Sequence, residues 1–339
     1  MFRLIFVVIF MLFGHSLRSQ KISVDTLLAD RISIRAVEIS EGKVFYAGTH
    51  STFGYVDVAN PTDRKQIQLS EKELQFRTLA QNGRYFFTVN IESPAYFFKI
   101  DKKTLSYKVV FQDTVKTAFY DAFRFINPHL GLAFSDPSDD LRLRLVLTDG
   151  NKKWMKICPA GLPVLVDGEA AFAASNTNIS SAGKYIWMAT GGKKSRIFRT
   201  QRNLVKWQVF DTPFVQGTSS QGIYSIDFYD EKQGIAAGGD YTRQNENTDN
   251  IATTSDGGET WQIQASGVNA GYITCVKYRP GSRGEEVVAV GDRHVSFSRD
   301  GGRTWTKLSD ERDLYTAGWL DAHTLVLAGK NRILRMKIE

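Results

Sequence analysis

The sequence repeats one eight-residue stretch almost unchanged, and this repeat is its strongest constraint on the fold. Residues 254–261 read TSDGGETW and residues 298–305 read SRDGGRTW, so the two tryptophans are 44 residues apart. Both copies follow the pattern S/T-x-D-x-G-x-T-W. A motif that returns at an interval of about 40–50 residues is typical of a β-propeller, in which each repeat forms one blade around a central axis.

Each copy has the composition of a tight turn between two antiparallel strands. The Gly-Gly pair supplies the positive φ angles that such turns require. The Asp carboxylate can accept hydrogen bonds from backbone N–H groups of its own turn, and the Trp ring can bury its apolar face beside it. We therefore interpret the repeated residues as structural and not catalytic: Asp256, Gly258, Trp261, Asp300, Gly302 and Trp305.

A weaker unit recurs along the whole chain: an apolar strand, a short turn, and a second strand that ends in small residues. The first strands are predicted at 34–37, 76–79, 120–123, 172–175, 224–227, 273–276 and 315–318. The second strands are VFYAG (44–48), YFFTV (85–89), LGLAF (130–134), YIWMA (185–189), GIAAG (234–238), VVAVG (287–291) and LVLAG (325–329). These seven matches predict an all-β fold, a seven-bladed β-propeller of four-stranded antiparallel blades.

The last unit is one strand short, because the chain ends soon after the predicted strand 333–338. Residues 22–28 precede the first unit and alternate between apolar and polar side chains as a strand does. We predict that this N-terminal strand completes the last blade and closes the ring, which leaves only short blade edges.

The N-terminus has the features of a signal peptide. Arg3 is followed by an apolar run at residues 4–13 and then by the small residues Gly14, Ser16 and Ser19. This run is shorter than the ~20 residues that span a bilayer, so we predict a cleaved signal peptide at 1–19 and a propeller domain at 20–339. The protein is expected to be exported to the periplasm, the cell surface or the medium, as a monomer without a transmembrane segment in the mature chain.

Composition and motifs argue against several classes of function. The net charge is +7, but basic residues are dispersed, so we expect no nucleic-acid partner. Cys158 and Cys275 fall in different units and are expected to be free thiols. No CxxC or HExxH motif occurs, so no metal site and no cofactor is predicted. Asp136, Asp139 and Asp140 carry oxygen ligands of the kind that calcium takes, but their spacing fits no EF-hand.

The two motif copies and the seven units resemble the Asp-box (BNR-type) β-propellers. The similarity is greatest to the photosystem II stability/assembly factor type, which has relatives in non-photosynthetic bacteria. The segments 119–125, 168–177 and 238–241 add to the resemblance, which extends over the whole mature chain. It implies a seven-bladed bacterial scaffold that binds another macromolecule, and it does not imply photosynthesis.

In such a propeller, the starts of the inner strands and the loops after the second strands emerge on one face, and the repeated turns emerge near the other. The candidate binding residues on the loop-rich face are Arg35, Arg77, Asp121, Glu169, Ser175, Asn176, Lys193, Asp240, Tyr241, Arg293 and His294. Arg35 and Arg77 occupy the same position in consecutive units, so we expect two adjacent guanidinium groups that favour an acidic ligand. The expected partner is a protein or an acidic glycan.

A carbohydrate-active hydrolase or lyase is the alternative, because sialidases also carry Asp boxes. Asp121 and Glu169 are its candidate catalytic carboxylates, beside Arg35 and Arg77. The early Phe-Arg-Ile-Pro signature of sialidases is absent. A deep pocket with two carboxyl groups ~5–10 Å apart would support the enzyme, whereas an open mouth would support the scaffold.

Overall fold

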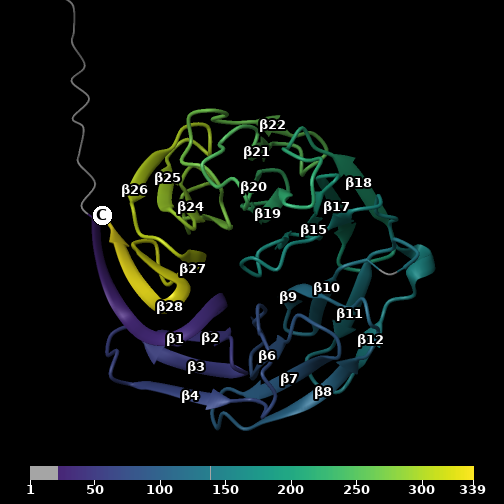
Figure 1. Ribbon diagram of the computed structural model, residues 1–339, viewed down its shortest axis with the longest axis vertical. Helices are drawn as coiled ribbons and strands as arrows, with labels where there is room; N and C mark the ends of the chain where they lie inside the picture. Colours follow the sequence, from purple (N-terminus) through teal and green to yellow (C-terminus); the bar gives the residue numbers. More distant parts are fainter. Residues whose placement is uncertain (1–21, 138) are drawn as a thin grey trace, which may run out of the picture.

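Six β-sheets surround a central axis in the part of the chain that the structure describes, residues 22–137 and 139–339 (Figure 1). The structure is a computed structural model. Neighbouring strands in these sheets are antiparallel, and one short 3-10 turn, η1 (Pro159–Gly161), lies between two strands. The predicted all-β propeller fold is confirmed. The predicted signal peptide at 1–19 lies outside the described residues.

The strands of each sheet follow in hydrogen-bonded order. One six-stranded sheet contains β27 (Leu314–Trp319), β28 (Thr324–Ile338), β1 (Ile22–Ser40), β2 (Lys43–Gly48), β3 (Thr52–Asp57) and β4 (Arg64–Gln68). The next two contain β5 (Ala80–Gln81), β6 (Tyr85–Val89), β7 (Ala95–Asp101) and β8 (Tyr107–Asp113), and then β9 (Tyr120–Asn127), β10 (Leu130–Ser135), β11 (Arg144–Thr148) and β12 (Trp154–Lys156).

The remaining three sheets complete the ring. A four-stranded sheet contains β14 (Ile179–Ala182), β15 (Tyr185–Ala189), β17 (Arg196–Gln201) and β18 (Trp207–Asp211). A six-stranded sheet contains β13 (Glu169–Ala170), β16 (Gly191–Gly192), β19 (Gln221–Phe228), β20 (Gly234–Asp240), β21 (Ile251–Thr254) and β22 (Gln262–Ile263). The last contains β23 (Cys275–Tyr278), β24 (Val287–Gly291), β25 (His294–Ser298) and β26 (Thr306–Ser309).

The prediction of seven separate blades is wrong, because the described strands form six sheets. The difference arises where the two ends of the chain meet. The first half of β1 pairs with β28 and its second half pairs with β2, so one long strand joins the first and last sequence units in a single sheet. The predicted ring closure is confirmed, since Ile22 pairs with Ile338 and Thr26 pairs with Leu334.

Strand register assigns the loops to two faces. Ile34 in β1 pairs with Gly48 at the end of β2, so the start of an inner strand lies beside the loop that follows the second strand. We call this side the mouth face. Gly234 at the start of β20 pairs with Thr254 at the end of β21, so the turn after β21 lies on the opposite side, the turn face.

The core lies between neighbouring sheets, and it explains which segments lie in the middle of a sheet. Apart from Lys43, β2 and β24 are runs of apolar residues and are almost entirely buried, as expected of strands covered on both sides. The outermost strand β4 has the sequence RKQIQ and is mostly exposed. Aromatic pairs join the sheets: the rings of Trp187 and Phe228 stack at 3.7 Å between centroids. None of the helices in the described residues is long and apolar enough to cross a membrane.

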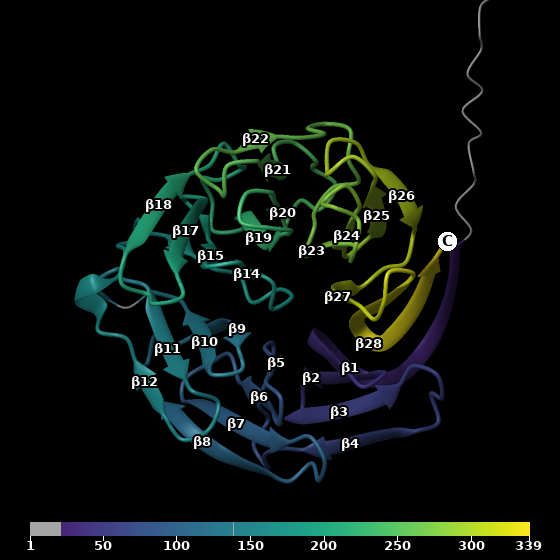
Figure 2. The ribbon, with the colours of Figure 1, turned by 180° about the vertical axis from the view of Figure 1, so that it is seen from behind.

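One predicted inner strand is wrong. Residues 172–175 are not a strand, and the inner strand of that unit begins at Ile179. Residues 171–178 instead form a loop that reaches toward the centre of the ring before β14, as Figure 2 shows. We call these residues the axial plug. Their small side chains, with Ala171, Ala173 and Ala174 among them, permit this close approach of the backbone to the axis.

Candidate functional site

The axial plug is held by hydrogen bonds from strands around the ring. Arg35 Nη1 donates to the carbonyl oxygen of Ala174 at 3.1 Å. Ser175 Oγ donates to the carbonyl oxygen of Thr274 at 2.6 Å, and Thr316 Oγ1 donates to that of Ser175 at 3.1 Å. The plug lies between two cavities, because residues 171–174 line one on the mouth face and residues 175–177 line another nearer the turn face.

Asn176 fixes the plug on a further side. Its Nδ2 donates to the carbonyl oxygen of Leu79 at 2.6 Å, and its Oδ1 accepts from the backbone N–H of Phe123 at 2.8 Å. Asn176 has a φ of 60°, a left-handed conformation that Asn adopts more readily than most residues. Both Ser175 and Asn176 were predicted to bind a ligand on the mouth face; the structure instead places their polar groups in bonds that hold the plug.

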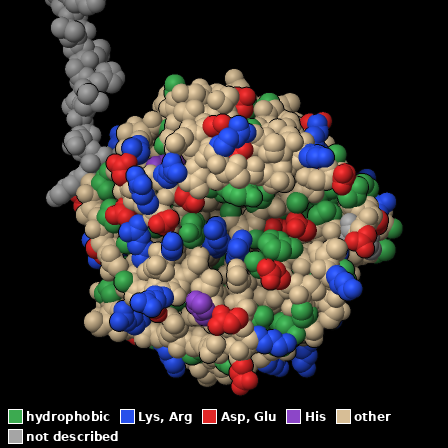
Figure 3. Space-filling view, viewed as in Figure 1, with side chains coloured by type: hydrophobic (Ala, Val, Ile, Leu, Met, Phe, Trp, Pro, Cys, Tyr) green, Lys and Arg blue, Asp and Glu red, His purple; other side chains and the backbone are tan. Residues whose placement is uncertain are grey.

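The mouth cavity lies on the other side of the plug and has a volume of about 350 Å³. Its lining residues come from inner-strand starts, from the plug and from loops after second strands: Arg35, Arg77, Phe119, Ala171, Phe172, Ala173, Ala174, Tyr224, Tyr241, Gln244, Tyr272 and Asp292. The face drawn in Figure 3 is hollowed at its centre, where Lys and Arg side chains lie next to hydrophobic ones. The sequence-predicted residues Arg35, Arg77 and Tyr241 are thus brought together.

Neither arginine of the mouth forms an ion pair with a described carboxylate, although the charge of Arg35 acts on Asp292 in the same cavity and that of Arg77 acts on Asp121. Arg35 stacks on Tyr315, with its guanidinium carbon 3.9 Å from the ring centroid. Arg77 Nη2 makes one long hydrogen bond of 3.5 Å to Gln75 Oε1. Burial and the positive charge of Arg35 lower the pKa of Arg77, which shows that the two cations are close enough to repel each other. An anion between them would relieve this repulsion.

An aromatic wall forms the other side of the mouth cavity. The rings of Phe172 and Tyr224 stack at 3.9 Å between centroids, and Tyr224 meets Tyr272 edge to face at 4.9 Å. Tyr241 stands beside them and is 51% exposed. A rigid aromatic surface next to cations suits a ligand that has both an apolar part and an acidic group.

Asp121, predicted to lie at the mouth, is fully buried, and neither of its carboxylate oxygens accepts a hydrogen bond from a described donor. Burial and the negative charge of Asp136 hold the pKa of Asp121 well above its usual value. Burial also raises the pKa of Asp136 to about 6. The ionisation of the two acids is linked, because a negative charge on one opposes ionisation of the other inside the protein. Arg77 faces this pair and offsets part of its charge.

Glu169 is committed to a buried ion pair. Its carboxylate accepts from Arg196 Nε at 3.0 Å and Nη2 at 2.5 Å, and from Thr190 Oγ1 at 2.6 Å. The Glu169 side chain is 0% exposed. The structure therefore pairs Asp121 with Asp136, and Glu169 does not line the mouth cavity.

The other predicted binding residues surround the mouth cavity without lining it. Asp240 accepts hydrogen bonds from Thr242 and forms an ion pair with Arg243 at 3.1 Å. His294 is 2% exposed, and burial lowers its pKa to about 4, so it is neutral at pH 7. Lys193 and Arg293 are exposed, and Arg293 Nη1 donates to Asn245 Oδ1 at 2.7 Å.

Sequence reasoning missed most of the aromatic wall as well as Gln244 and Phe119. Tyr224 and Tyr272 lie at or just before inner strands, where the sequence analysis considered only polar residues. A search for aromatic residues at these positions would have found both. Phe172 was assigned to a strand, so its place beside Tyr224 was not predicted.

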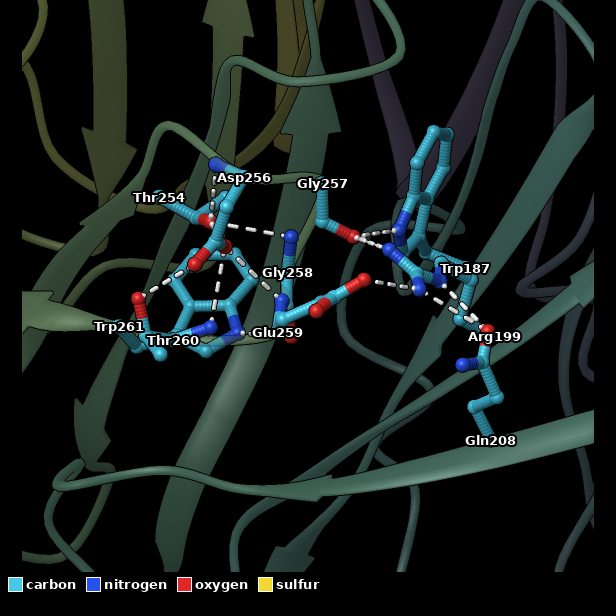
Figure 4. Close-up of polar contacts among 10 residues, drawn as sticks. All are labelled: Trp187, Arg199, Gln208, Thr254, Asp256, Gly257, Gly258, Glu259, Thr260 and Trp261. Atoms are coloured by element: carbon cyan, nitrogen blue, oxygen red, sulfur yellow. Dashed lines mark hydrogen bonds and ion pairs between the residues drawn. The ribbon is translucent and has the colours of Figure 1, made fainter.

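The repeated turns lie on the turn face and use their polar groups internally (Figure 4). Asp256 Oδ1 accepts from the backbone N–H groups of Glu259 and Thr260, each at 3.0 Å. Trp261 Nε1 donates to the carbonyl oxygen of Gly258 at 3.0 Å, and Gly258 has a φ of 87°. Asp300, Gly302 and Trp305 make the equivalent contacts in the second copy.

The first copy is also attached to the neighbouring sheet. Trp187 Nε1 and Arg199 Nη1 both donate to the carbonyl oxygen of Gly257, at 2.7 and 2.9 Å (Figure 4). Arg199 also forms an ion pair with Glu259 at 2.7 Å. Gly257 has a φ of 79°, and a Cβ there would meet the Glu231 carbonyl oxygen at 2.7 Å, so glycine is required.

The described residues contain no group of three or more metal-ligating side chains that could hold an ion. Cys158 is exposed and Cys275 is buried, and neither forms a disulfide. The carboxyl group of Asp136, considered above as a calcium ligand, is turned toward Asp121.

No family model and no curated protein matches the chain. Solved structures do match in fold. YCF48 bound to a D1 peptide has a TM-score of 0.66 and 14% identity, over 94% of this chain and 97% of that chain. YCF48 from Cyanidioschyzon merolae has a TM-score of 0.65 and 12% identity, over 93% and 98%. U3-55K is similar, with a TM-score of 0.65 and 12% identity, over 93% and 98%. At these identities the likeness shows that the chain shares a β-propeller fold with these proteins.

Proposed function

We propose that the protein is an exported binding scaffold that holds an acidic segment of a partner protein at the mouth cavity. The observation that carries this proposal is the pair of adjacent guanidinium groups, Arg35 and Arg77, neither of which forms an ion pair with a carboxylate in the described part of the chain. Guanidinium groups bind carboxylates through two parallel hydrogen bonds, and a partner carboxylate would complete the ion pairs that the fold leaves open.

A peptide suits the cavity better than an acidic glycan. The wall of Phe172, Tyr224 and Tyr272 offers apolar contact area that a peptide side chain can fill next to an Asp or Glu. YCF48, which shares the fold, has been solved with a bound peptide. This likeness supports a protein partner without identifying it.

The buried acids favour binding over hydrolysis. A glycosidase needs two carboxyl groups that reach the substrate. Asp121 is fully buried, and Glu169 is held by Arg196 and Thr190. Neither is therefore placed to act on a sugar in the mouth cavity.

We further propose that the turns at 254–261 and 298–305 are Asp boxes of the BNR type. In support of this, both copies make the same hydrogen bonds.

Export and a monomeric state complete the proposal. N-terminal sequencing of the native protein is expected to find a start near Leu17 or Gln20, and sedimentation is expected to give one 38.1 kDa chain less its signal peptide. A native chain that starts at Met1 would contradict export.

Selection from a peptide library displayed on phage tests the binding proposal. Wild-type protein is expected to enrich peptides that contain Asp or Glu next to an apolar residue. The double variant Arg35→Gln, Arg77→Gln should lose this enrichment. The matched control, Arg31→Gln with Arg202→Gln, removes the same charge from two exposed side chains outside the mouth cavity and should select the same peptides as wild type. Equal enrichment by all three proteins would overturn the proposal.

A further inference from the structure

A second cavity lies on the other side of the axial plug and has a volume of about 300 Å³. The plug residues Ser175, Asn176 and Thr177 line it, whereas Ala171 to Ala174 line the mouth cavity. Its other walls come from the later parts of the inner strands: Val37, Glu38, Ile39, Phe123, Arg124, Lys277, Thr316, Ala317, Gly318 and Trp319. We call it the far cavity. Its size is near the lower end of the range for small-molecule sites.

The far cavity contains two cations that lack an ion pair among the described residues, Arg124 and Lys277. Both are close enough to act on Glu38, and burial nevertheless raises the pKa of Glu38. Glu38 Oε2 already accepts a hydrogen bond from Gln81 at 2.8 Å. Two positive charges thus face one carboxyl group, that of Glu38. This group already has a hydrogen bond from Gln81, which does not line the cavity.

Two buried donors of the cavity wall are also unsatisfied. Arg124 Nε and the indole Nε1 of Trp319 are both buried and have no hydrogen-bond partner in the described structure. A buried donor without a partner costs free energy, because it has lost its hydrogen bonds to water. Arg124 Nε, Trp319 Nε1 and the Lys277 ammonium group are all hydrogen-bond donors that need a partner. A ligand that satisfies them is therefore an acceptor that carries negative charge.

An apolar part of the remaining wall belongs to Val37, Ile39, Phe123 and Ala317, beside the polar residues of the plug and Thr316. This surface suits a short hydrocarbon part. We propose that the far cavity is a second binding site, which takes a small organic carboxylate, with its carboxylate on Arg124 and Lys277 and its hydrocarbon part on this apolar wall. The indole N–H of Trp319 supplies a further hydrogen bond.

The site is independent of the proposed function. It shares no lining residue with the mouth cavity, and the plug backbone lies between them. The two sites also differ in the ligand that they can take, since the mouth cavity opens on a face with an exposed aromatic residue, Tyr241, and the far cavity is lined by half-buried charges. Loss of one activity therefore leaves the other measurable.

Calorimetric titration tests this site with acetate, butyrate and succinate as probes, in a buffer free of carboxylates. The neutral amides acetamide and butyramide are the matched control ligands. At least one carboxylate is expected to bind with a Kd in the micromolar to low millimolar range, and its amide is expected not to bind. Absence of binding by all three carboxylates, or equal binding of the amides, would overturn the proposal.

Substitutions of lining residues test whether the carboxylate binds in the far cavity. Arg124→Gln and Lys277→Gln are each expected to raise the Kd by about tenfold or more, because each removes one charge from the carboxylate contact. The mouth variant Arg35→Gln, Arg77→Gln should leave the Kd unchanged. If Arg124→Gln does not fold, Trp319→Phe keeps an aromatic ring, removes the indole N–H and should raise the Kd several-fold. A Kd that these far-cavity substitutions leave unchanged, or that the mouth variant alone raises, would contradict the assignment.

Discussion

The repeated turns and the mouth cavity differ in how their polar groups are used. In the first turn, Asp256 accepts hydrogen bonds from Glu259 and Thr260, and the buried carbonyl oxygen of Gly257 accepts two from the neighbouring sheet. At the mouth, Arg35 and Arg77 form no ion pair with a described carboxylate, although Asp292 and Asp121 are close enough to interact with them. The polar groups of the turns are therefore hydrogen-bonded within the fold, whereas the two arginines of the mouth can still form ion pairs with a partner.

This difference explains why the most conspicuous motif of the sequence gives no direct information on function. The motif recurs because both copies form the same local structure, a tight turn beside a Trp side chain. Binding capacity lies where the fold leaves charges uncompensated. Substitutions in the turns should therefore change the free energy of unfolding, and substitutions at the mouth should change affinity.

The largest expected effect is the loss of a turn tryptophan. Trp261 is 8% exposed and meets Phe228 edge to face at 6.0 Å between centroids. Trp261→Ala should lower the free energy of unfolding by about 3–5 kcal/mol, since it removes a buried aromatic ring. Trp305 is only half-buried, so Trp305→Ala should cost less. Denaturant unfolding of both variants measures the difference, and an equal or reversed order would contradict this account of the two turns.

Loss of the turn carboxylate should have a smaller effect. Asp256→Ala removes the acceptor for two backbone N–H groups and for the hydroxyl of Thr260. We expect a loss of about 1–3 kcal/mol in the free energy of unfolding. Binding by the folded variant should be unchanged. If the folded, stable variant lost binding selectively, the binding site would have to include the turn face.

The acid pair beneath the mouth should give an effect of at most similar size, and this effect should depend on pH. Because the pKa of Asp136 is raised to about 6, the folded protein holds a proton that the unfolded chain releases near pH 4. Asp136 therefore reduces stability as the pH rises from about 4 to about 6. Asp136→Asn removes this effect, so the variant should gain about 1–3 kcal/mol relative to wild type between pH 4 and pH 7.

Unfolding free energies of wild type and Asp136→Asn at both pH values give this difference directly. His294 titrates in the same range with the opposite sign, since its pKa is lowered to about 4, but it is present in both proteins and cancels. A difference that stays constant with pH would show that Asp136 does not carry the extra proton.

The sequence predicted the repeating part of the structure and missed the part that does not repeat. The periodicity of the second strands and the alternation in residues 22–28 predicted the sheets and the ring closure, because both follow from local apolar patterns. The number of sheets could not be predicted, since β1 continues through two units without a break. Residues 172–175 resembled a strand in composition, but their long-range bonds to Arg35 and Thr274 make them part of the plug.

The candidate site at the mouth could likewise be predicted only where its residues follow the repeat. Arg35 and Arg77 could be predicted as neighbours, because equivalent positions in consecutive repeats lie side by side. The ion pair of Glu169 with Arg196 and the acid pair of Asp121 with Asp136 could not, because they join residues with no common position in the repeat. The neutral state of His294 depends on its burial, which its loop position in the sequence did not reveal.

The most direct test of the central claim is the salt dependence of affinity for an acidic peptide selected by the wild-type protein. Between low and high salt, wild-type affinity should fall, since exposed charge pairs are screened. In the folded Arg35→Gln, Arg77→Gln variant, affinity at low salt should be about tenfold weaker or more and its salt dependence smaller. Loss of the Arg35 hydrogen bond to the plug should also lower the free energy of unfolding by about 1 kcal/mol. Affinity and salt dependence equal to those of wild type in the folded double variant would show that these arginines do not form the binding site.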